Sequence, residues 1–122
     1  MAARLAGAPA VIGFDVMNEP PWGSHAVWTF EAERLVPLYD RVVAEVRAEA
    51  PGWVAFLEPA ASRNLGFATA LPRPAVADVV YAPHAYDADA EAGRGFDPAH
   101  RDAVLANGVA LAGEAAALGA AL

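Results

Sequence analysis

The sequence predicts an α/β fold with a parallel sheet. Three short apolar runs, VIGFDVM, WVAFL and VVY, are separated by longer segments, two of which contain helical periodicity. Each run leads into polar residues or proline, which is typical of a strand that stops at the edge of a sheet. An alternation of strands and helices joins parallel strands through right-handed crossovers. On this alternation alone, a doubly wound sheet and a segment of a barrel are equally good solutions.

The composition excludes several functional classes. The 122 residues are 57% hydrophobic, which suits a buried sheet covered by helices. The net charge of -7, with only 8 basic residues, argues against nucleic acid as a partner and favours a neutral or weakly charged substrate. Cysteine is absent, so disulfides and thiolate chemistry are excluded. We expect no cofactor and no metal.

The beginning of the chain carries no targeting signal in its pattern. The first ten residues, MAARLAGAPA, lack the apolar run of a signal peptide, and no stretch reaches the roughly 20 apolar residues of a membrane span. The localisation stays open, although secretion of a full-length protein would fit. Residues 1–8 have the pattern of the last turn of a helix that ends at Gly7. A domain that begins in this way is expected to be cut from a longer one.

The first predicted strand ends at a carboxylate. Residues 11–17 are largely apolar and predict a strand buried on both faces, and Asn18-Glu19-Pro20 stops it. Glu19 therefore lies at the carboxyl end of the strand, where parallel α/β folds collect ligands and catalytic groups. Trp22 and Trp28 follow in the loop. Their rings could stack on a sugar or pack against their own scaffold, and the sequence leaves both readings open.

A helix and a second strand follow. Residues 30–50 carry apolar side chains at a spacing of three and four, and Pro37 is expected to kink this helix or mark its true start. The predicted buried face comprises Leu35, Leu38, Val42, Val43 and Val46, and Glu31 is assigned to the opposite, polar face. Residues 53–57 then predict a strand that ends in Glu58-Pro59. Glu58 either reaches into a site or caps the next turn.

The third strand carries a histidine and a tyrosine beyond its apolar start. Residues 60–74 form a long connection with weak helical character at residues 65–71, and residues 79–86 predict the strand. His84 and Tyr86 are two apart, so in an extended chain their side chains point to the same side. Both can donate hydrogen bonds to a carboxylate and hold it in position. The pair is therefore a stronger indication of a site than a single histidine.

A final helix closes the chain. Asp97 and Pro98 are suited to its first turn, and Gly119 is suited to its end. The expected apolar stripe comprises Val104, Leu105, Val109, Leu111, Ala112, Ala115 and Leu118. Residues 120–122 then lead toward a fourth strand.

Asp15 is expected to point toward the same interior as Glu19. The two are four residues apart, so the period of two places them on one face of the strand. A charged carboxylate there is costly without a cation, and the predicted strands offer no inward Lys or Arg. A basic partner from another strand, or bonds from neighbouring backbone groups, would satisfy it.

Two of these segments together resemble a known family. VIGFDVMNEPPWG at residues 11–23 and YAPHAYD at residues 81–87 are similar to glycoside hydrolase family 5, the cellulase family, in wording closest to its endoglycoceramidase-like members. The resemblance implies a (β/α)₈ TIM barrel, of which residues 1–122 would form a partial domain with strands four to six and their helices. It also implies that Glu19 is the general acid/base and that Asn18 binds a sugar hydroxyl. His84 and Tyr86 would line the cleavage site and orient a second carboxylate.

The implied activity is that of a retaining β-glycosidase acting on a carbohydrate or glycolipid substrate. Such enzymes use two carboxylates, and the second one is expected beyond Leu122. Glu114 is rejected for that role because it lies in an alanine-rich, helical stretch. The expected substrate-binding residues are Asn18, Trp22, Glu58, His84 and Tyr86. Two alternatives stay open: a barrel glycosidase of another family with an Asn-Glu acid/base, and a non-catalytic carbohydrate-binding relative.

The same reasoning predicts how the chain behaves alone. As an internal fragment without its nucleophile it is expected to be inactive. Three parallel strands of an open barrel leave strand edges and an apolar inner face exposed, so poor stability or self-association is expected.

Overall fold

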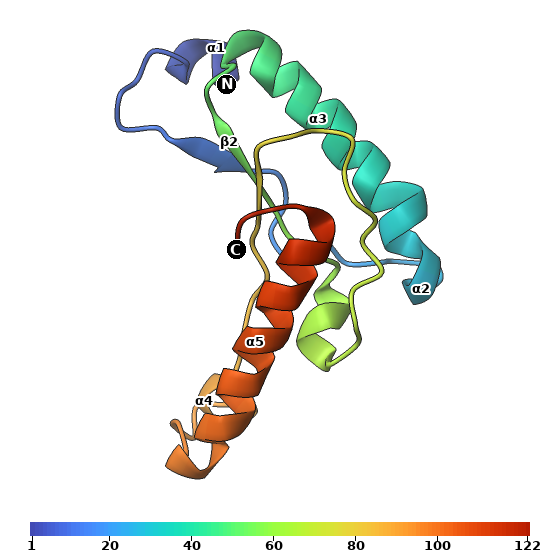
Figure 1. Cartoon of the computed structure of the whole chain (residues 1–122), viewed down its shortest axis with the longest axis vertical. Coiled ribbons are helices and arrows are strands. Elements are labelled where there is room, and N and C mark those ends of the chain that lie inside the picture. Colours follow the sequence, from blue (N-terminus) through green and yellow to red (C-terminus); the bar gives the residue numbers. More distant parts are fainter.

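Three parallel strands form the centre of the structure, a computed structural model that describes all residues 1–122 (Figure 1). They are β1 (Gly13–Asp15), β2 (Val54–Leu57) and β3 (Val79–Tyr81), hydrogen-bonded in the order β1-β2-β3. Asp15 lies opposite Phe56, which in turn lies opposite Val80. Ala121 adds a parallel bridge to Val80. The end of the chain thus lies beside β3, where a fourth strand would begin, as the sequence predicts.

The strands are added in one direction only. Strand β2 follows β1, β3 follows β2 and Ala121 follows β3, each on the same side of the last. A barrel adds all its strands in this way, and each half of a doubly wound sheet does so up to the point where the direction reverses. The order therefore fits the predicted segment of a (β/α)₈ barrel.

The connection from β1 to β2 is one continuous helical path. It comprises α2 (Val27–Phe30), a π-helical segment (Glu31–Leu35) and α3 (Val36–Glu49), and it follows the short α1 (Ala2–Leu5) at the beginning of the chain. Pro37 is the second residue of α3 and directly follows the π-helical segment. It therefore lies inside the helical path, where the π-helix changes to an α-helix, and the true start of the path is at Val27. The predicted cap at Gly7 is wrong, because α1 ends at Leu5, Ala6 follows in right-handed geometry, and Gly7 does not have the positive φ of a glycine cap.

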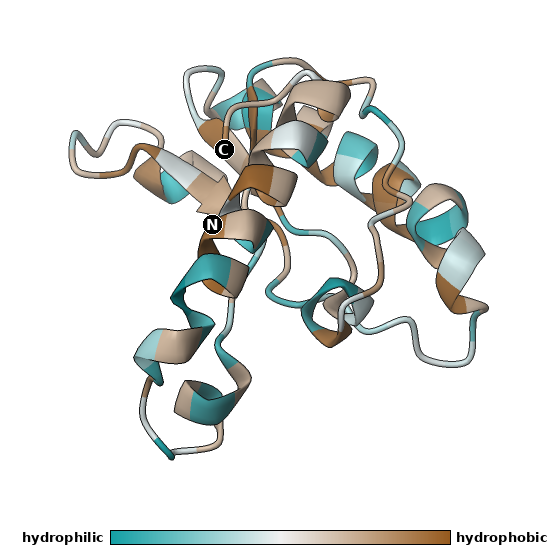
Figure 2. Ribbon diagram, turned by 60° about the horizontal axis from the view of Figure 1, so that its bottom comes forward, coloured by the Kyte–Doolittle hydropathy of each residue, from teal (hydrophilic) through white to brown (hydrophobic).

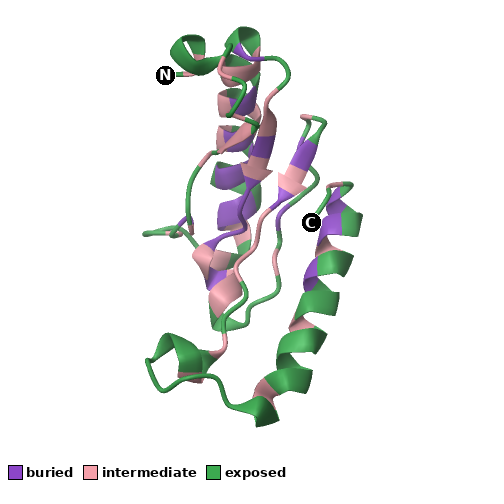
Figure 3. Cartoon of the chain, turned by 90° about the vertical axis from the view of Figure 1, so that its left-hand side faces the viewer, coloured by how far each residue is buried: buried purple, intermediate pink, exposed green.

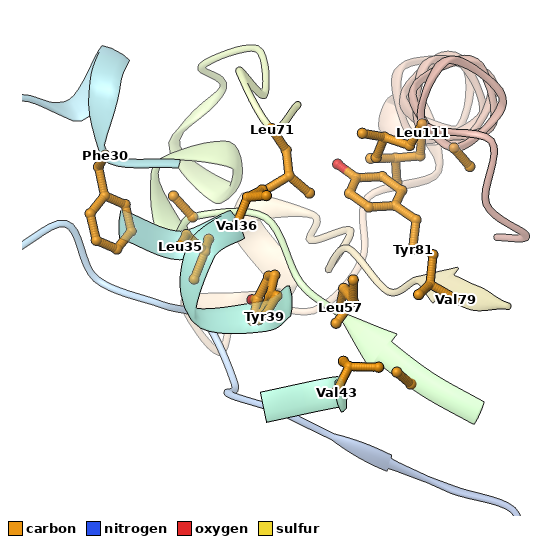
Figure 4. Close-up of a cluster of buried hydrophobic side chains, with 14 residues drawn as sticks. Phe30, Leu35, Val36, Tyr39, Val43, Leu57, Leu71, Val79, Tyr81 and Leu111 are labelled. Carbon is orange, nitrogen blue, oxygen red and sulfur yellow. The ribbon is translucent and has the colours of Figure 1, made fainter. Parts of the chain in front are cut away.

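Helix α3 and the preceding turn pack on β2 and β3. Their buried positions are Leu35, Val36, Tyr39 and Val43 (Figure 4). The predicted stripe is therefore displaced, because Leu38, Val42 and Val46 are only half-buried. Tyr39 is fully buried because its hydroxyl group donates a 2.6 Å hydrogen bond to the Glu58 carbonyl. This bond fixes the end of β2 against the helix.

Glu31 lies inside the structure, so its assignment to the polar face is wrong. Glu31 is only 3% exposed. The carboxylate accepts hydrogen bonds from the Ala60 N–H at 2.8 Å, from the Thr69 hydroxyl group and from the Ala70 N–H. A carboxylate can be buried when several donors satisfy it, and these donors come from a connection that the sequence left undefined.

The two faces of the sheet differ in burial. Leu57, Val79 and Tyr81 point toward the helices (Figure 4), and together with Ala55 they belong to the hydrophobic core. The alternate residues, including Asp15 and Phe56, point the other way. Strand β1 lies at the sheet edge and is less buried than predicted: Ile12, next to it, is 72% exposed.

Glycine at position 13 permits the close pairing of β1 with β2. A Cβ atom there would lie 2.2 Å from the Val54 carbonyl oxygen and 2.9 Å from the Phe56 ring. The ladder continues one residue beyond β1 on each side, through the Val54 N–H to the Ile12 carbonyl and the Val16 N–H to the Phe56 carbonyl.

Beyond β2 the chain makes a 3₁₀ turn at Ala61–Leu65, which ends at the left-handed Gly66. The helical character predicted for residues 65–71 is wrong, because the helical turn lies before Gly66 and not after it. Strand β3 is likewise shorter than predicted, and the short helix α4 (Ala88–Glu91) follows it. Hydrophilic residues, in teal, are prominent around α4 and the first turns of the last helix (Figure 2).

The last helix is α5 (Arg101–Leu118), preceded by a 3₁₀ turn at Pro98–His100. As predicted, Asp97 caps the beginning by accepting from the Ala99 N–H, and Gly119 ends the helix with a φ of 68°. Only the part of α5 near the end of the chain is buried, at Leu111, Ala115 and Leu118 (Figure 3). Val104, Leu105, Val109 and Ala112 are exposed, so the predicted stripe is right only at Leu111, Ala115 and Leu118. No helix has both the length and the hydropathy of a membrane-spanning segment.

Candidate active site

Glu19 lies just beyond the carboxyl end of β1, where the chain turns sharply. Its φ of 44° is in the left-handed region, which a residue with a long side chain rarely adopts. The Glu19 N–H donates a 2.6 Å hydrogen bond to Oε2 of Glu58, which follows β2. The Pro20 carbonyl accepts from the Ala61 N–H at 2.9 Å. Two bonds from the neighbouring connection therefore hold the turn that carries Glu19.

Three side chains converge on one oxygen of Glu19. Its Oε1 lies 2.7 Å from Nδ1 of His84, 2.6 Å from the Tyr86 hydroxyl group and 2.8 Å from Nδ2 of Asn64. Oε2 accepts no hydrogen bond from the chain. One oxygen is thus fixed in place, and the other is available to a ligand.

His84 lies between two carboxylates. Nδ1 faces Glu19, and Nε2 lies 3.3 Å from Oε1 of Glu58. The ring also meets Tyr86 edge-on, with centroids 5.5 Å apart, and its Nδ1 lies 2.6 Å from the Tyr86 hydroxyl group. His84 and Tyr86 reach the same carboxylate, as their spacing of two predicts.

These contacts shift the protonation of the cluster. Hydrogen bonds from Tyr86 and His84 hold the pKa of Glu19 below its ordinary value. The hydrogen bond to Glu19 raises the pKa of His84, against a smaller effect of burial, and the charge of Glu58 adds to the rise. The hydrogen bond to Glu19 also raises the pKa of Tyr86 to about 12. The cluster therefore favours an ionised Glu19 beside a protonated His84.

Glu58 is the buried member of the group. The residue is 3% exposed, and burial raises the pKa of its carboxyl group, while the Glu19 N–H and His84 act in the opposite direction. Asp15 is close enough to contribute to that rise. Asp15 itself accepts from the Met17 N–H at 3.0 Å, and no Lys or Arg of the chain forms a salt bridge with it.

The other predicted site residues are less tightly held. Asn18 is exposed beside Glu19. Trp22 is half-buried and packs against the hydrophobic core, whereas Trp28 is exposed on α2. The structure thus gathers Glu19, Glu58, His84 and Tyr86 through direct contacts, and Asn18 and Trp22 lie on the adjoining turn and loop.

Asn64 is a site residue that the sequence does not reveal. It lies in the 3₁₀ turn after β2, within a connection that has no pattern of its own. The only indication was its place after Glu58-Pro59, in the loop that leaves the same sheet edge as Glu19. Asn64 and Tyr86 also line an open hollow of about 310 Å³, together with Arg63, Asp87, His100 and Asn107.

Glu114 belongs to a different cluster. It lies within α5, accepts a 2.7 Å hydrogen bond from the Tyr81 hydroxyl group and forms a salt bridge with Arg63 at 3.0 Å. Arg63 also donates to Oδ1 of Asn107 at 3.0 Å. None of these groups contacts Glu19. The structure contains no group of three or more acidic or histidine side chains arranged to hold a metal ion.

Comparisons with known proteins show the family of the chain and confirm that its fold is part of a (β/α)₈ barrel. The chain matches the family Cellulase (glycosyl hydrolase family 5) over residues 1–119. It is similar to solved structures of endo-glycoceramidase II from Rhodococcus sp.: in the ganglioside GM3 complex the identity is 28% and the TM-score 0.80, and in a cellobiose-like imidazole complex they are 31% and 0.76. Each match covers 97% of this chain and 28% of that chain.

A complex of the same enzyme with a cellobiose-like isofagomine gives a TM-score of 0.82 at 28% identity, again over 97% of this chain and 28% of that chain. Comparison with curated protein sequences gives no match. The family match covers nearly all residues, from the helix before β1 to the end of α5, and includes both segments that meet at Glu19. The chain belongs to the cellulase family, glycosyl hydrolase family 5.

Proposed function

We propose that the chain supplies the acid/base half of a retaining β-glycosidase that acts on a glycan or glycolipid. The observation that carries the proposal is Glu19 itself, at the carboxyl end of a barrel strand, with Oε1 held by three donors and Oε2 free. A general acid must present one oxygen to the leaving group in a fixed orientation. A residue that only binds sugar does not need this arrangement.

In the first step Glu19 donates its proton to the leaving oxygen, and in the second it accepts a proton from water. A second carboxylate, about 5–5.5 Å away, attacks the sugar in retaining enzymes. We place that nucleophile outside residues 1–122, in the remainder of a barrel that is longer than this chain, which spans 28% of endo-glycoceramidase II.

The protonation of Glu19 supports the need for that partner. Within this chain the Tyr86 and His84 hydrogen bonds hold the pKa of Glu19 low, which suits the base step and opposes the acid step. A neighbouring negative charge acts in the opposite direction and favours the protonated acid. The nucleophile would therefore complete the site electrostatically as well as chemically.

The positions of the side chains around Glu19 suggest what each would contribute to substrate binding. Asn18, exposed beside Glu19, would bind a sugar hydroxyl group. His84 and Tyr86 would line the cleavage site and stabilise the Glu19 carboxylate that forms when the leaving group departs. Trp22 would offer the exposed part of its ring to a sugar. Ganglioside GM3, which is bound in one of the similar structures, makes a glycolipid a reasonable first substrate to test.

The test compares Glu19→Gln with Glu114→Gln in the complete enzyme. For a β-glycoside with a poor leaving group, Glu19→Gln is expected to lower kcat by about 10²–10⁴-fold, the usual contribution of acid–base catalysis. An aryl β-glycoside with a good leaving group needs no protonation, so its first step should change far less. Glu114→Gln should leave both rates near those of the parent.

Equal rates of the parent and Glu19→Gln on the poor leaving group would refute the acid/base assignment. Sugar binding without turnover by the complete protein would instead favour a non-catalytic relative.

A further inference from the structure

Glu58 touches the acid/base group without being able to reach a substrate itself. The residue is 3% exposed, and its side chain is enclosed after β2 between the core and the Glu19 turn. Oε2 accepts the Glu19 N–H at 2.6 Å, and Oε1 lies 3.3 Å from Nε2 of His84. Both oxygens are thus engaged by the site, which argues against the direct substrate contact expected from the sequence.

We propose that Glu58 is a positioning residue that holds the backbone of Glu19 with one oxygen and the far edge of the His84 ring with the other. This inference rests on the proposed role of Glu19. Glu58 would then affect catalysis only through Glu19 and His84.

The first half concerns the Glu19 backbone. A φ of 44° strains a residue that has a Cβ atom, so the turn needs a compensating contact. The Glu58 carboxylate supplies one, because a hydrogen bond to a charged acceptor is about twice as strong as a neutral one. Glu58 is held in turn by its own backbone, whose carbonyl accepts from the buried Tyr39 hydroxyl group.

The second half concerns the His84 ring. The groups that face it are Glu19, Glu58 and Tyr86, with Asp15 farther away. A ring with a carboxylate at each nitrogen can donate to both only as an imidazolium. The negative charge of Glu58 beside Nε2 therefore favours the ring that is protonated on both nitrogens and whose Nδ1 is directed at Glu19.

The experiment uses the 122-residue chain and its three histidines. Ring ¹⁵N and ¹H shifts of His84 and His100 are followed through a pH titration in the parent, in Glu58→Gln and in the control Glu114→Gln. His100 is an internal reference, because its raised pKa comes from Asp87 and not from this cluster. The Glu19 amide proton is followed in the same spectra.

In Glu58→Gln the pKa of His84 should fall toward its ordinary value, and the Glu19 amide shift should move upfield, while His100 stays unchanged. Glu114→Gln should change neither His84 nor the Glu19 amide. An unchanged His84 titration in a folded Glu58→Gln protein would overturn the proposal.

If Glu58→Gln fails to fold, Glu58→Asp keeps the charge and shortens the side chain by one methylene. It should then retain part of the raised pKa of His84 and lose the low-field position of the Glu19 amide. A Glu58→Asp protein identical to the parent in both shifts would also overturn the proposal. Since neither readout is an activity, failure of this inference is distinct from failure of the acid/base assignment, which the Glu19→Gln rates test.

Discussion

Two glutamates in this chain have nearly the same partners and different surroundings. Glu19 accepts from the Tyr86 hydroxyl group at 2.6 Å and lies 2.7 Å from His84. Glu114 accepts from the Tyr81 hydroxyl group at 2.7 Å and from Arg63 at 3.0 Å. Tyr86 is 44% exposed, whereas Tyr81 is 2% exposed. A carboxylate with a tyrosine and a cation is therefore not by itself an active site.

The difference lies in which atoms are free and which charges can change. Glu114 uses both oxygens, because Arg63 contacts each of them and Tyr81 takes one. Glu19 keeps Oε2 free. A guanidinium group stays charged throughout the pH range of folded proteins, whereas an imidazole changes its charge near neutrality. The Glu19 cluster thus has the free oxygen and the titratable partner that the proposed acid/base role requires. The Glu114 cluster joins α5 to β3 and to the turn after β2.

The largest expected difference is in stability. Glu114→Ala removes the acceptor of both Arg63 and Tyr81 where they are mostly buried, and it should lower the free energy of unfolding by about 1–3 kcal/mol. Glu19→Ala removes a more exposed carboxylate in a strained turn and should cost clearly less. Urea unfolding of both variants, followed by circular dichroism, measures the two costs. Equal costs would mean that the clusters do not divide structure from chemistry in this way.

Removing the hydroxyl group of Tyr81 should cost more unfolding free energy than removing that of Tyr86. This difference should be smaller than the one between the two glutamates. Tyr81→Phe removes a hydroxyl group that donates inside the core, for which about 0.5–1.5 kcal/mol is usual. Tyr86→Phe removes one that water can replace, so its unfolding free energy should stay within about 0.5 kcal/mol of the parent. The same urea experiment applies. A larger loss at Tyr86 would show that the Glu19 cluster itself contributes to the stability of the fold.

Much of this division could be predicted from the sequence, because local pattern and strand ends carry it. The order of strands and helices, the place of Glu19 at a strand end, and the shared side of His84 and Tyr86 follow from periods of two and 3.6 and from proline. The end of α5 at Gly119 follows from backbone chemistry. The rejection of Glu114 as nucleophile rested on the helical pattern around it, and the structure does place it within α5.

The rest depends on contacts between distant segments. Asn64 donates a hydrogen bond to Glu19, which lies 45 positions earlier in the sequence. Glu31 accepts hydrogen bonds from groups that lie at least 29 positions further along the chain. Neither connection has a periodicity that could predict it. The displaced stripe of α3 has a similar cause, since the buried Tyr39 depends on the carbonyl of Glu58, which lies 19 residues further on.

The pH dependence of stability should separate the clusters again, with a smaller effect. His84 has a raised pKa, so its contribution is complete below its ordinary value of 6.5 and is lost as the pH rises through the raised value. Glu19 has a lowered pKa, so its contribution is present above its ordinary value of 4.5 and is lost as the pH falls through the lowered one. The difference in unfolding free energy between the parent and His84→Gln should therefore be greatest between pH 4.5 and pH 6.5, the ordinary pKa values of Glu19 and His84. Urea unfolding at a series of pH values measures it.

The matched series with Arg63→Gln should show no decline on the alkaline side, because a guanidinium group keeps its charge there. A parent–variant difference that is flat with pH for His84→Gln would contradict the protonated His84 on which the contrast depends.

The smallest change in unfolding free energy is expected at Asp15, which lies on the face of the sheet that the helices leave uncovered. In this chain Asp15 is exposed and accepts only the Met17 N–H, a bond that an asparagine oxygen can also accept. Asp15→Asn should therefore change the unfolding free energy by no more than about 0.5 kcal/mol. It should also lower the pKa of Glu58 slightly, because the Asp15 charge is one of the smaller causes of its rise.

In the complete enzyme the same substitution should cost more. The period of two directs Asp15 toward the barrel interior with Phe56 on the next strand, where a buried carboxylate needs a cation. A basic residue from another strand would supply it, and removing one member of a fully buried pair costs on the order of 3–5 kcal/mol. Urea unfolding of Asp15→Asn in both proteins gives the two values. A small change in both would show that backbone donors satisfy Asp15 in the barrel as they do here, and that no cation meets it from the other strands.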